Sequence, residues 1–219
     1  MLKPLMVHIP QGTIQLRDDR KQTTWSTQLD AYLMSKYPIT QEMYTYLMGN
    51  NPSVFKGTHR PVESVSWLDA IDFCNALSRA CELEDYYDVV SGHEVKVSPK
   101  HNDGYRLPTD AEWEYACRAD SGKVQYGPID QIAWYAENSN DSTQDVGMKQ
   151  PNAFGLHDML GNVWEWCWDV YDAEVYGSYR VFRGGGWADR SRGCLASNRR
   201  RSHPTYAIDD LGFRVARSL

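Results

Sequence analysis

The chain has 219 residues, of which 42% are hydrophobic, 24% charged and 12% aromatic, a composition that excludes a disordered chain. Its length suits one large globular domain or at most two fused lobes. The net charge of −6 argues against binding to nucleic acid, and no apolar run is long enough for a transmembrane segment.

The first half of the chain predicts alternating strands and helices. Residues 7–16 are expected to form a hairpin or strand with a turn at Pro10 and Gly12, and residues 30–39 a second strand. Thr40 occupies an N-cap position ahead of a helix over residues 41–48. The pattern after Ser66 predicts a longer helix with one buried face, ending near Cys81.

A polar excursion over residues 84–105 is expected to be a hairpin with loops. Thr109 and Glu112 form a capping-box pattern, which predicts a short helix through Arg118. Residues 119–162 are rich in Gly, Pro, Asn and Asp, so loops dominate there. Because no repeat or linker is evident, these elements predict one α+β domain over residues 1–219.

Three tryptophans alternate near residue 165, an arrangement that places them on one face of a strand and is typical of a core. Cys167 and Asp169 would share the opposite face with Glu165. The chain has five cysteines without metal-ligand spacing, so buried free thiols are expected rather than disulfides or a zinc site. The tryptophans are Trp164, Trp166 and Trp168, and the remaining cysteines are Cys74, Cys81, Cys117 and Cys194.

The stretch from Ala188 to Asp210 has an unusual composition, since its 23 residues include no Lys, Glu, Gln, Met or Trp. These five types supply 42 of the 219 residues, so roughly four or five would be expected there by chance. The stretch contains five arginines together with His203 and Tyr206, all good interface residues. A binding surface is one interpretation; the other is a solvated loop whose arginines pair with acids elsewhere.

Long motifs from one end of the chain to the other resemble the formylglycine-generating-enzyme, or sulfatase-modifying factor, superfamily. They are Ile9-Pro10-Gln11-Gly12, Tyr37-Pro38-Ile39-Thr40, the run from Tyr105 to Ala116, the run from Gly155 to Trp166, Arg183-Gly184-Gly185 and Gly212-Phe213-Arg214. The resemblance implies a loop-rich C-type-lectin-like fold of the formylglycine-generating-enzyme type. It also implies a calcium site formed by the Asp158 and Glu165 side chains with the Gly161 and Val163 carbonyls. From the residues alone, Glu165 could instead pair with an arginine and Asp158 could cap the turn.

The resemblance also bears on catalysis. The oxidases of the family use a cysteine pair shortly after the Gly-Gly motif, and no cysteine stands between Trp187 and Cys194. A lone thiol cannot cycle between dithiol and disulfide, so no enzymatic activity and no catalytic residue is expected.

Within the superfamily, the chain is most similar to variable proteins that retroelements diversify, such as the Treponema variable proteins. Template codons of the AAC type in those systems never yield Lys, Glu, Gln, Met or Trp, the set missing here. The resemblance implies a variable ligand-binding region over residues 183–217, in which Trp187, Cys194, Arg199, Pro204 and the Gly-Phe-Arg motif are scaffold, with Trp187 beneath or beside the binding face. The expected binding residues are Trp187, Ala188, Asp189, Arg190, Asn198, Arg200, Ser202, His203, Tyr206, Ile208, Asp209 and Asp210.

The function predicted from these residues is non-enzymatic binding of an unknown ligand, expected to be a protein or another macromolecule. The resemblance implies display on a bacterial surface, although no signal peptide is evident at Met1-Leu2-Lys3-Pro4. Two alternatives stay open: a related oxidoreductase that uses Cys194, and a structural member of the family.

Overall fold

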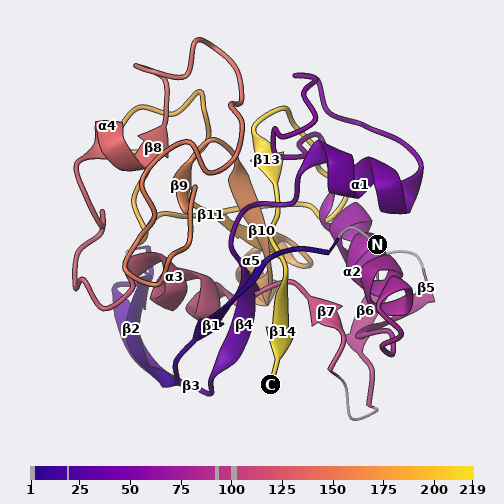
Figure 1. The fold of residues 1–219 in the computed structure, drawn as a ribbon. Helices are drawn as coiled ribbons and strands as arrows, with labels where there is room; N and C mark the ends of the chain where they lie inside the picture. The colour runs from indigo at the N-terminus through magenta and orange to yellow at the C-terminus, as the bar shows by residue number, and fades with distance from the viewer. Residues whose placement is uncertain (1–2, 19, 92–93, 100–102) are drawn as a thin grey trace.

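The computed structural model describes residues 3–18, 20–91, 94–99 and 103–219. Its regular elements are joined by long irregular segments, as the loop-rich composition predicts (Figure 1). Within the described residues no helix has the length and apolar character needed to cross a membrane.

Two sheets of four strands organise the chain. The first has the order β1-β4-β14-β7 and is antiparallel throughout. Its strands are Met6–Ile9 (β1), Tyr32–Ser35 (β4), Ala216–Ser218 (β14) and Tyr105–Arg106 (β7). The second has the order β12-β11-β10-β13, with only β10 and β13 parallel. Its strands are Arg199–Ser202 (β12), Arg180–Arg183 (β11), Trp164–Val170 (β10) and Leu211–Gly212 (β13).

Three two-stranded ladders complete the strands of the described residues. They pair Gly12–Asp18 (β2) with Thr23–Leu29 (β3), Tyr87–Ser91 (β5) with Glu94–Val97 (β6), and Ala133–Trp134 (β8) with Leu160–Gly161 (β9). Within the stretch expected to form a hairpin, residues 84–105, β5 and β6 pair antiparallel, while residues 92–93 and 100–102 of that prediction lie outside the described residues. Over residues 7–16, where a hairpin or strand is expected, the structure has strands β1 and β2 on either side of residues 10–11, but they do not form a hairpin with each other, because β1 pairs with β4 and β2 with β3.

The helices are Gln41–Met48 (α1), Trp67–Ala80 (α2), Asp110–Arg118 (α3), Ile129–Ile132 (α4) and Ala173–Tyr176 (α5). Capping boxes begin α2 at Ser66 and α3 at Thr109, because in each the cap side chain and the residue three positions later bond each other's backbone N–H. Thr40 caps α1 through the Met43 N–H. The three longer helices thus begin where the sequence predicts.

Strand β10 divides the core into two clusters. Trp164 and Trp166 pack with α1 and α2 on one side, and Cys167 packs with α3 and the β2–β3 hairpin on the other. Figure 1 shows α2 and α3 on opposite sides of this strand. The predicted alternation along β10 is confirmed, because the tryptophans face one cluster and Cys167 faces the other. The alternation also determines which side chains of β10 lie beside the 188–210 segment.

Candidate functional site: an arginine-lined hollow in the 188–210 segment

The backbone after Trp187 is held by loops from elsewhere in the chain. Backbone N–H donors and side-chain amides bond carbonyls across the segment at 2.8–3.2 Å. These bonds are Trp187 N–H to Asn162, Ala136 N–H to the Asp189 carbonyl, Ala196 N–H to Val124, and the Gln125 side-chain amide to the Cys194 carbonyl. Cys194 is fully buried in the core. The segment is irregular in secondary structure, yet it is anchored at many points.

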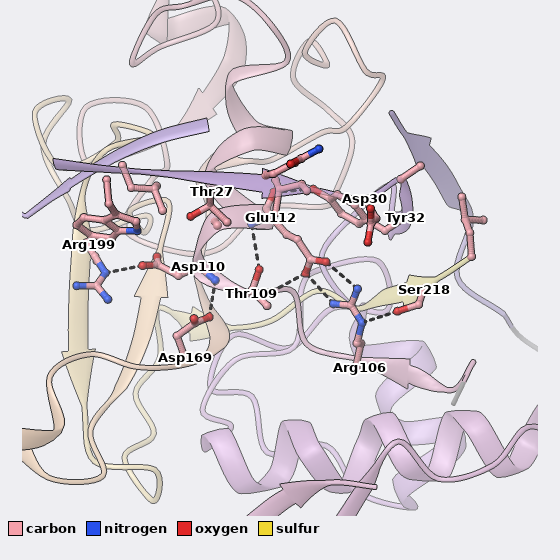
Figure 2. A pocket seen from close by; sticks show the side chains of 17 residues that line it. Thr27, Asp30, Tyr32, Arg106, Thr109, Asp110, Glu112, Asp169, Arg199 and Ser218 are labelled. Carbon is pink, nitrogen blue, oxygen red and sulfur yellow. Dashed lines mark hydrogen bonds and ion pairs between the residues drawn. The ribbon is translucent and has the colours of Figure 1, made fainter. Parts of the chain in front are cut away.

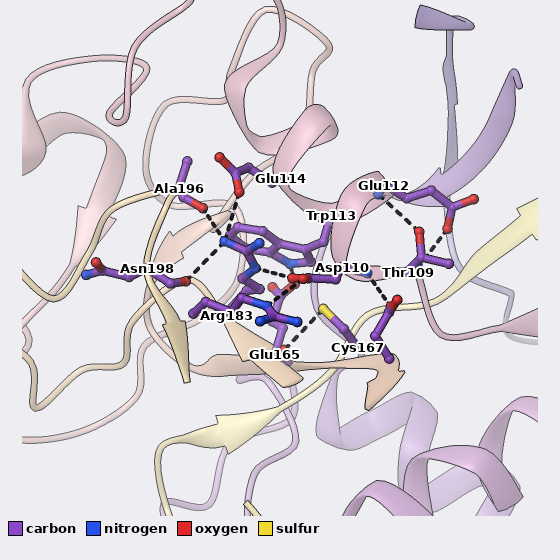
Figure 3. A network of polar contacts seen from close by, with 12 residues as sticks. Thr109, Asp110, Glu112, Trp113, Glu114, Glu165, Cys167, Arg183, Ala196 and Asn198 are labelled. Atoms are coloured by element: carbon purple, nitrogen blue, oxygen red, sulfur yellow. Dashed lines mark hydrogen bonds and ion pairs between the residues drawn. The ribbon is translucent and has the colours of Figure 1, made fainter. Parts of the chain in front are cut away.

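Arg183, in the frame that precedes the segment, supplies a second anchor (Figure 3). Its buried guanidinium donates from Nε to Asp110 Oδ1 at 2.5 Å and from Nη1 to the Ala196 carbonyl at 2.9 Å. The same Nη1 lies 3.0 Å from Glu114 Oε2. Asp110 and Glu114 belong to α3, so one buried arginine fixes the 188–210 segment to that helix.

Against this fixed backbone lies an open hollow of about 550 Å³, which we call the arginine hollow. Five of its eight lining residues are predicted binding residues. The lining consists of Ala188, Asp189, Arg190, Arg192, Gly193, Asn198, Arg199 and Arg200. Ala188, Arg190, Arg192 and Arg200 are exposed. The structure therefore gathers five of the twelve predicted binding residues into one concave surface.

Asp189 organises the floor of the hollow. Its Oδ2 accepts hydrogen bonds from Trp164 Nε1 at 2.6 Å and from the Gly186 N–H at 3.0 Å. Its Oδ1 accepts one from Arg200 Nη2 at 3.1 Å. A Cβ at Gly193 would lie 2.7 Å from the Asp189 Cβ, so glycine is needed where the chain passes the aspartate. Asp189 was predicted as a replaceable residue, and its side chain carries structural contacts as well.

Strand β12 separates scaffold from surface by simple alternation. The Arg199 side chain is 13% exposed and donates from Nε to Asp110 Oδ2 at 2.6 Å. The Arg200 side chain is 56% exposed, and its guanidinium carbon lies 4.6 Å from the centre of the Trp164 ring. Placing Arg199 in the scaffold and Arg200 on the surface agrees with these positions.

The remaining predicted residues are distributed beyond the hollow. Trp187 is partly buried, donates from Nε1 to the Asp209 carbonyl at 3.0 Å and meets Phe55 edge to face. Tyr206 and Ile208 are exposed, at 40% and 38%. Ser202 and His203 are half-buried, and the His203 Nδ1 lies 2.8 Å from the Thr205 hydroxyl. None of these residues lines the arginine hollow.

Two further residues face inward. The Asn198 amide nitrogen donates to the Arg192 and Gly193 carbonyls at 2.9 and 2.8 Å, which closes the turn beside the hollow. Burial raises the pKa of Asp210 to about 6, and the negative charges of Asp189 and Asp209 add to this effect. Asn198 therefore also supports the local backbone, and the Asp210 carbonyl does so by accepting a 2.7 Å hydrogen bond from the Trp164 N–H.

Arg192 lines the hollow although the sequence did not single it out. Arg192 lies within the stretch that lacks five residue types, and its position in that stretch is the one sequence feature that could have identified it as a lining residue. Arg199 also borders a second pocket, of about 530 Å³, between the β2–β3 hairpin and α3 (Figure 2). No predicted binding residue lines that pocket, where Asp169 Oδ2 accepts a 2.5 Å hydrogen bond from the Asp110 N–H.

The residues implied for calcium lie at the β9–β10 junction. Glu165 is fully buried and accepts hydrogen bonds from Arg214 at 2.7 and 2.8 Å and from Trp113 Nε1 at 2.6 Å. Because Arg214 neutralises it, Glu165 does not fit the role of a calcium ligand, and its pairing with an arginine is the alternative that the sequence left open.

Asp158 has a different environment. Its Oδ2 accepts from the Gly147 N–H at 2.6 Å, whereas its buried Oδ1 has no hydrogen-bond partner in the described part of the chain. Burial raises the pKa of this carboxyl to about 6. An unsatisfied buried oxygen beside the Gly161 turn fits a cation or a proton, although no group of three or more acidic, His or Cys side chains suited to a metal occurs among the described residues. The calcium site stays a prediction, carried by Asp158 with the Gly161 and Val163 carbonyls.

The cysteines occupy the environments expected of core thiols. All five are free, and four are buried. Burial raises the pKa of Cys194 to about 12, with further contributions from Asp189 and Glu137. A thiol that stays protonated is a poor nucleophile and a poor metal ligand.

Comparisons with known proteins cover the whole of this architecture. The sulfatase-modifying factor enzyme 1-like domain family matches residues 2–219. The structure of Treponema denticola variable protein 1 superimposes with a TM-score of 0.88 and 33% identity over 98% of this chain and 95% of that one. The chaperone protein LppX of Paenibacillus barcinonensis is 33% identical over 87% of this chain and 81% of its own length. The formylglycine-generating enzyme of mouse is 27% identical over 82% of this chain, and this match spans half of the enzyme.

Proposed function

The chain belongs to the sulfatase-modifying factor enzyme 1-like domain family, and we propose that it is a binding protein whose scaffold presents replaceable side chains from residues 188–210. One observation carries this proposal. The backbone of residues 187–198 is fixed by hydrogen bonds from outside the segment, while the side chains of Ala188, Arg190 and Arg200 are exposed around a hollow.

The energetics of such an arrangement favour replacement of side chains. Substitutions at exposed positions usually change stability by less than about 0.5 kcal/mol. In the hydrogen bonds with Asn162, Ala136, Val124 and Gln125, the segment contributes backbone carbonyl and N–H groups, which every residue type except proline supplies in full. A hollow whose backbone is ordered before binding also reduces the entropy lost when a ligand binds. New specificities can therefore arise without a new fold.

The family comparisons support a variable surface. The structure that matches with a TM-score of 0.88 is named a variable protein, and it shares the fold across nearly the whole chain. We infer that the 183–217 region of this chain is diversified by a retroelement, which would account for the five residue types missing from residues 188–210. The expected partner is a protein or another macromolecule, because the exposed residues extend from the open hollow to Tyr206 and Ile208.

The cysteine environments argue against oxidase chemistry in this chain. Cys194 is the thiol nearest to the hollow in sequence, and its high pKa keeps it protonated at neutral pH. The side chain packs against Gly185, where an added Cβ would lie 2.8 Å from its sulfur. The proposal therefore assigns Cys194 to the scaffold.

A display library tests the proposal directly. Residues Ala188, Arg190, Arg192, Arg200 and Tyr206 would be randomised together in the full chain and displayed on yeast. Most members are expected to fold, as judged by protease resistance. Selection against hen lysozyme, an arbitrary folded target, is expected to yield binders that lose binding when the five positions are restored.

A matched library supplies the control. It would randomise five exposed positions away from the segment: Gln15 and Thr24 of the β2–β3 hairpin, Tyr46, Lys123 and Met148. This library is expected to fold equally well and to give no lysozyme binders. If the first library unfolds, or if it yields no more binders than the second, the 188–210 segment is not a replaceable binding surface.

A further inference from the structure

We propose that the arginine hollow of this chain selects an acidic protein segment, whose Asp and Glu carboxylates would bind Arg190, Arg192 and Arg200. The proposal rests on the proposed binding function and names the class of ligand for this particular set of side chains. Four of the eight lining residues are arginines, and Asp189 is the single acid among them.

The arginines of the hollow differ in whether their charge is already paired with a carboxylate. The Arg199 side chain points away from the hollow and forms an ion pair with Asp110 in the scaffold. Arg200 pairs with Asp189, which already accepts two other hydrogen bonds. Within the described ranges, Arg190 and Arg192 have neither an ion pair nor a side-chain hydrogen bond, and both are exposed. Two guanidinium groups are therefore available at the rim, and the hollow carries a local positive charge.

The Arg200 guanidinium is held in a fixed position within the hollow. Its guanidinium lies over the Trp164 ring at 4.6 Å, and the ring is fixed because its Nε1 donates to Asp189. A guanidinium held in this way presents its planar N–H groups to a carboxylate with little further loss of freedom. Arg200 would thus bind one carboxylate, and the two rim arginines would bind others on the same extended segment.

The extent of the positive charge favours a peptide over a nucleic acid. Binding to a nucleic acid depends on many phosphate contacts along a broad basic surface. Here the basic residues are confined to one hollow on a chain with a net charge of −6, and the adjacent residues Asp209 and Asp210 are acidic. Such a patch matches two or three carboxylates and would repel a long polyanion.

Panning of a random dodecamer peptide library on phage against the purified full chain tests the inference. The selected peptides are expected to be enriched in Asp and Glu relative to the input library. The Kd of the strongest acidic peptide is expected to rise about tenfold or more in R190Q/R192Q, because two charge-assisted contacts are lost. The affinity should also fall as salt is raised.

Two controls separate charge from folding. R79Q/K96Q removes the same charge from exposed residues of α2 and β6, and it should keep the acidic preference. Both double variants should melt at the temperature of the parent chain. Absence of acidic enrichment overturns the inference, as does equal enrichment by the two variants. Binding of an oligothymidylate that R190Q/R192Q abolishes, without acidic peptides, would instead indicate a nucleic-acid site. If the display library yields lysozyme binders while the peptides show no acidic preference, the binding function stands and only the ligand class fails.

Discussion

Arg214 and Glu165 face each other in the core as a two-point ion pair, with Nε 2.7 Å from Oε2 and Nη2 2.8 Å from Oε1. Arg214 also donates to the Ser35 and His157 carbonyls at 3.0 and 2.9 Å. The pair thereby joins the Gly-Phe-Arg motif near the C-terminus to β10 and to the end of β4. Two motifs that lie far apart in the sequence are thus halves of one buried contact.

Arg214→Met is expected to reduce the free energy of unfolding by about 3–5 kcal/mol, because it leaves the Glu165 carboxylate buried without its counter-charge. The double variant E165Q/R214M should be less destabilised than R214M alone, since it leaves no unpaired carboxylate at position 165. Urea denaturation measures both values. Arg79→Met, which breaks the exposed pair with Asp85, should cost less than about 1 kcal/mol. Equal losses for R214M and R79M would contradict the assigned role of the pair.

The 188–210 segment is expected to tolerate substitution unevenly. Asp189→Ala would leave Trp164 Nε1 and the Gly186 N–H without their acceptor and should cost about 1–2 kcal/mol. Arg190→Ala removes an exposed side chain and should cost less than about 0.5 kcal/mol. Thermal unfolding of the two variants beside the parent chain measures the difference. Similar melting temperatures for the two variants would mean that Asp189 is as replaceable as its neighbour.

The fold was predictable where a local signal decides the structure. The capping boxes at Ser66 and Thr109 begin their helices as the sequence indicates, because the bonds involved span three residues. Strand pairing was harder: β1 and β2 are separated by two residues but pair with β4 and β3. The choice of partner depends on which face each strand buries, and that is settled by distant residues such as those of β14.

The candidate site was also predictable only where local sequence features determine it. Composition found the segment, and strand alternation explains why Arg199 and Arg200 differ. The inward direction of Asp189 and Asn198 could not be deduced, since their acceptors and donors depend on how the loop folds back on itself. The pairing of Glu165 with Arg214 was open for a similar reason, because the sequence contains many arginines and does not show which of them lies close to Glu165.

Asp169 should make stability depend on pH. Burial, together with the adjacent Asp110, raises the pKa of its carboxyl to about 6, above the ordinary value of 3.8. A raised pKa in the folded state means that protonation favours folding, so this contribution is complete below about pH 4 and is lost as pH rises through about 6.

Asp169→Asn is therefore expected to raise the free energy of unfolding at pH 7.5 by up to about 3 kcal/mol and to leave it nearly unchanged at pH 4. The amide oxygen can still accept the hydrogen bond from the Asp110 N–H. Urea denaturation at the two pH values measures this effect, and Asp120→Asn, at an exposed position, is the matched control. A stabilisation that is equal at both pH values would show that the carboxyl does not titrate in this range.

Calcium is expected to raise the melting temperature through Asp158, whose Oδ1 is buried without a partner in the described structure. The rise should be small, because Arg214 already neutralises Glu165. Asp158→Asn should abolish it while the chain still folds, since asparagine tolerates the φ of +54° at this position. Calorimetry with calcium, with magnesium and with a chelator measures the effect. Identical melting temperatures in all three conditions would show that calcium does not stabilise this fold.

The missing residue types should have a genetic cause. If AAC-type codons in a template are randomised at adenines, then Lys, Glu, Gln, Met and Trp cannot arise at the diversified positions of residues 188–210. Sequencing of the DNA around the native gene is therefore expected to show a near-copy of the segment that encodes residues 183–217, differing only at adenines and adjoining a reverse transcriptase. The frame residues Arg183 and Arg214 should be encoded identically in both copies, because each holds a buried ion pair. If no such copy exists, the composition of residues 188–210 is fixed by one ligand or by packing, and diversification is excluded as its origin.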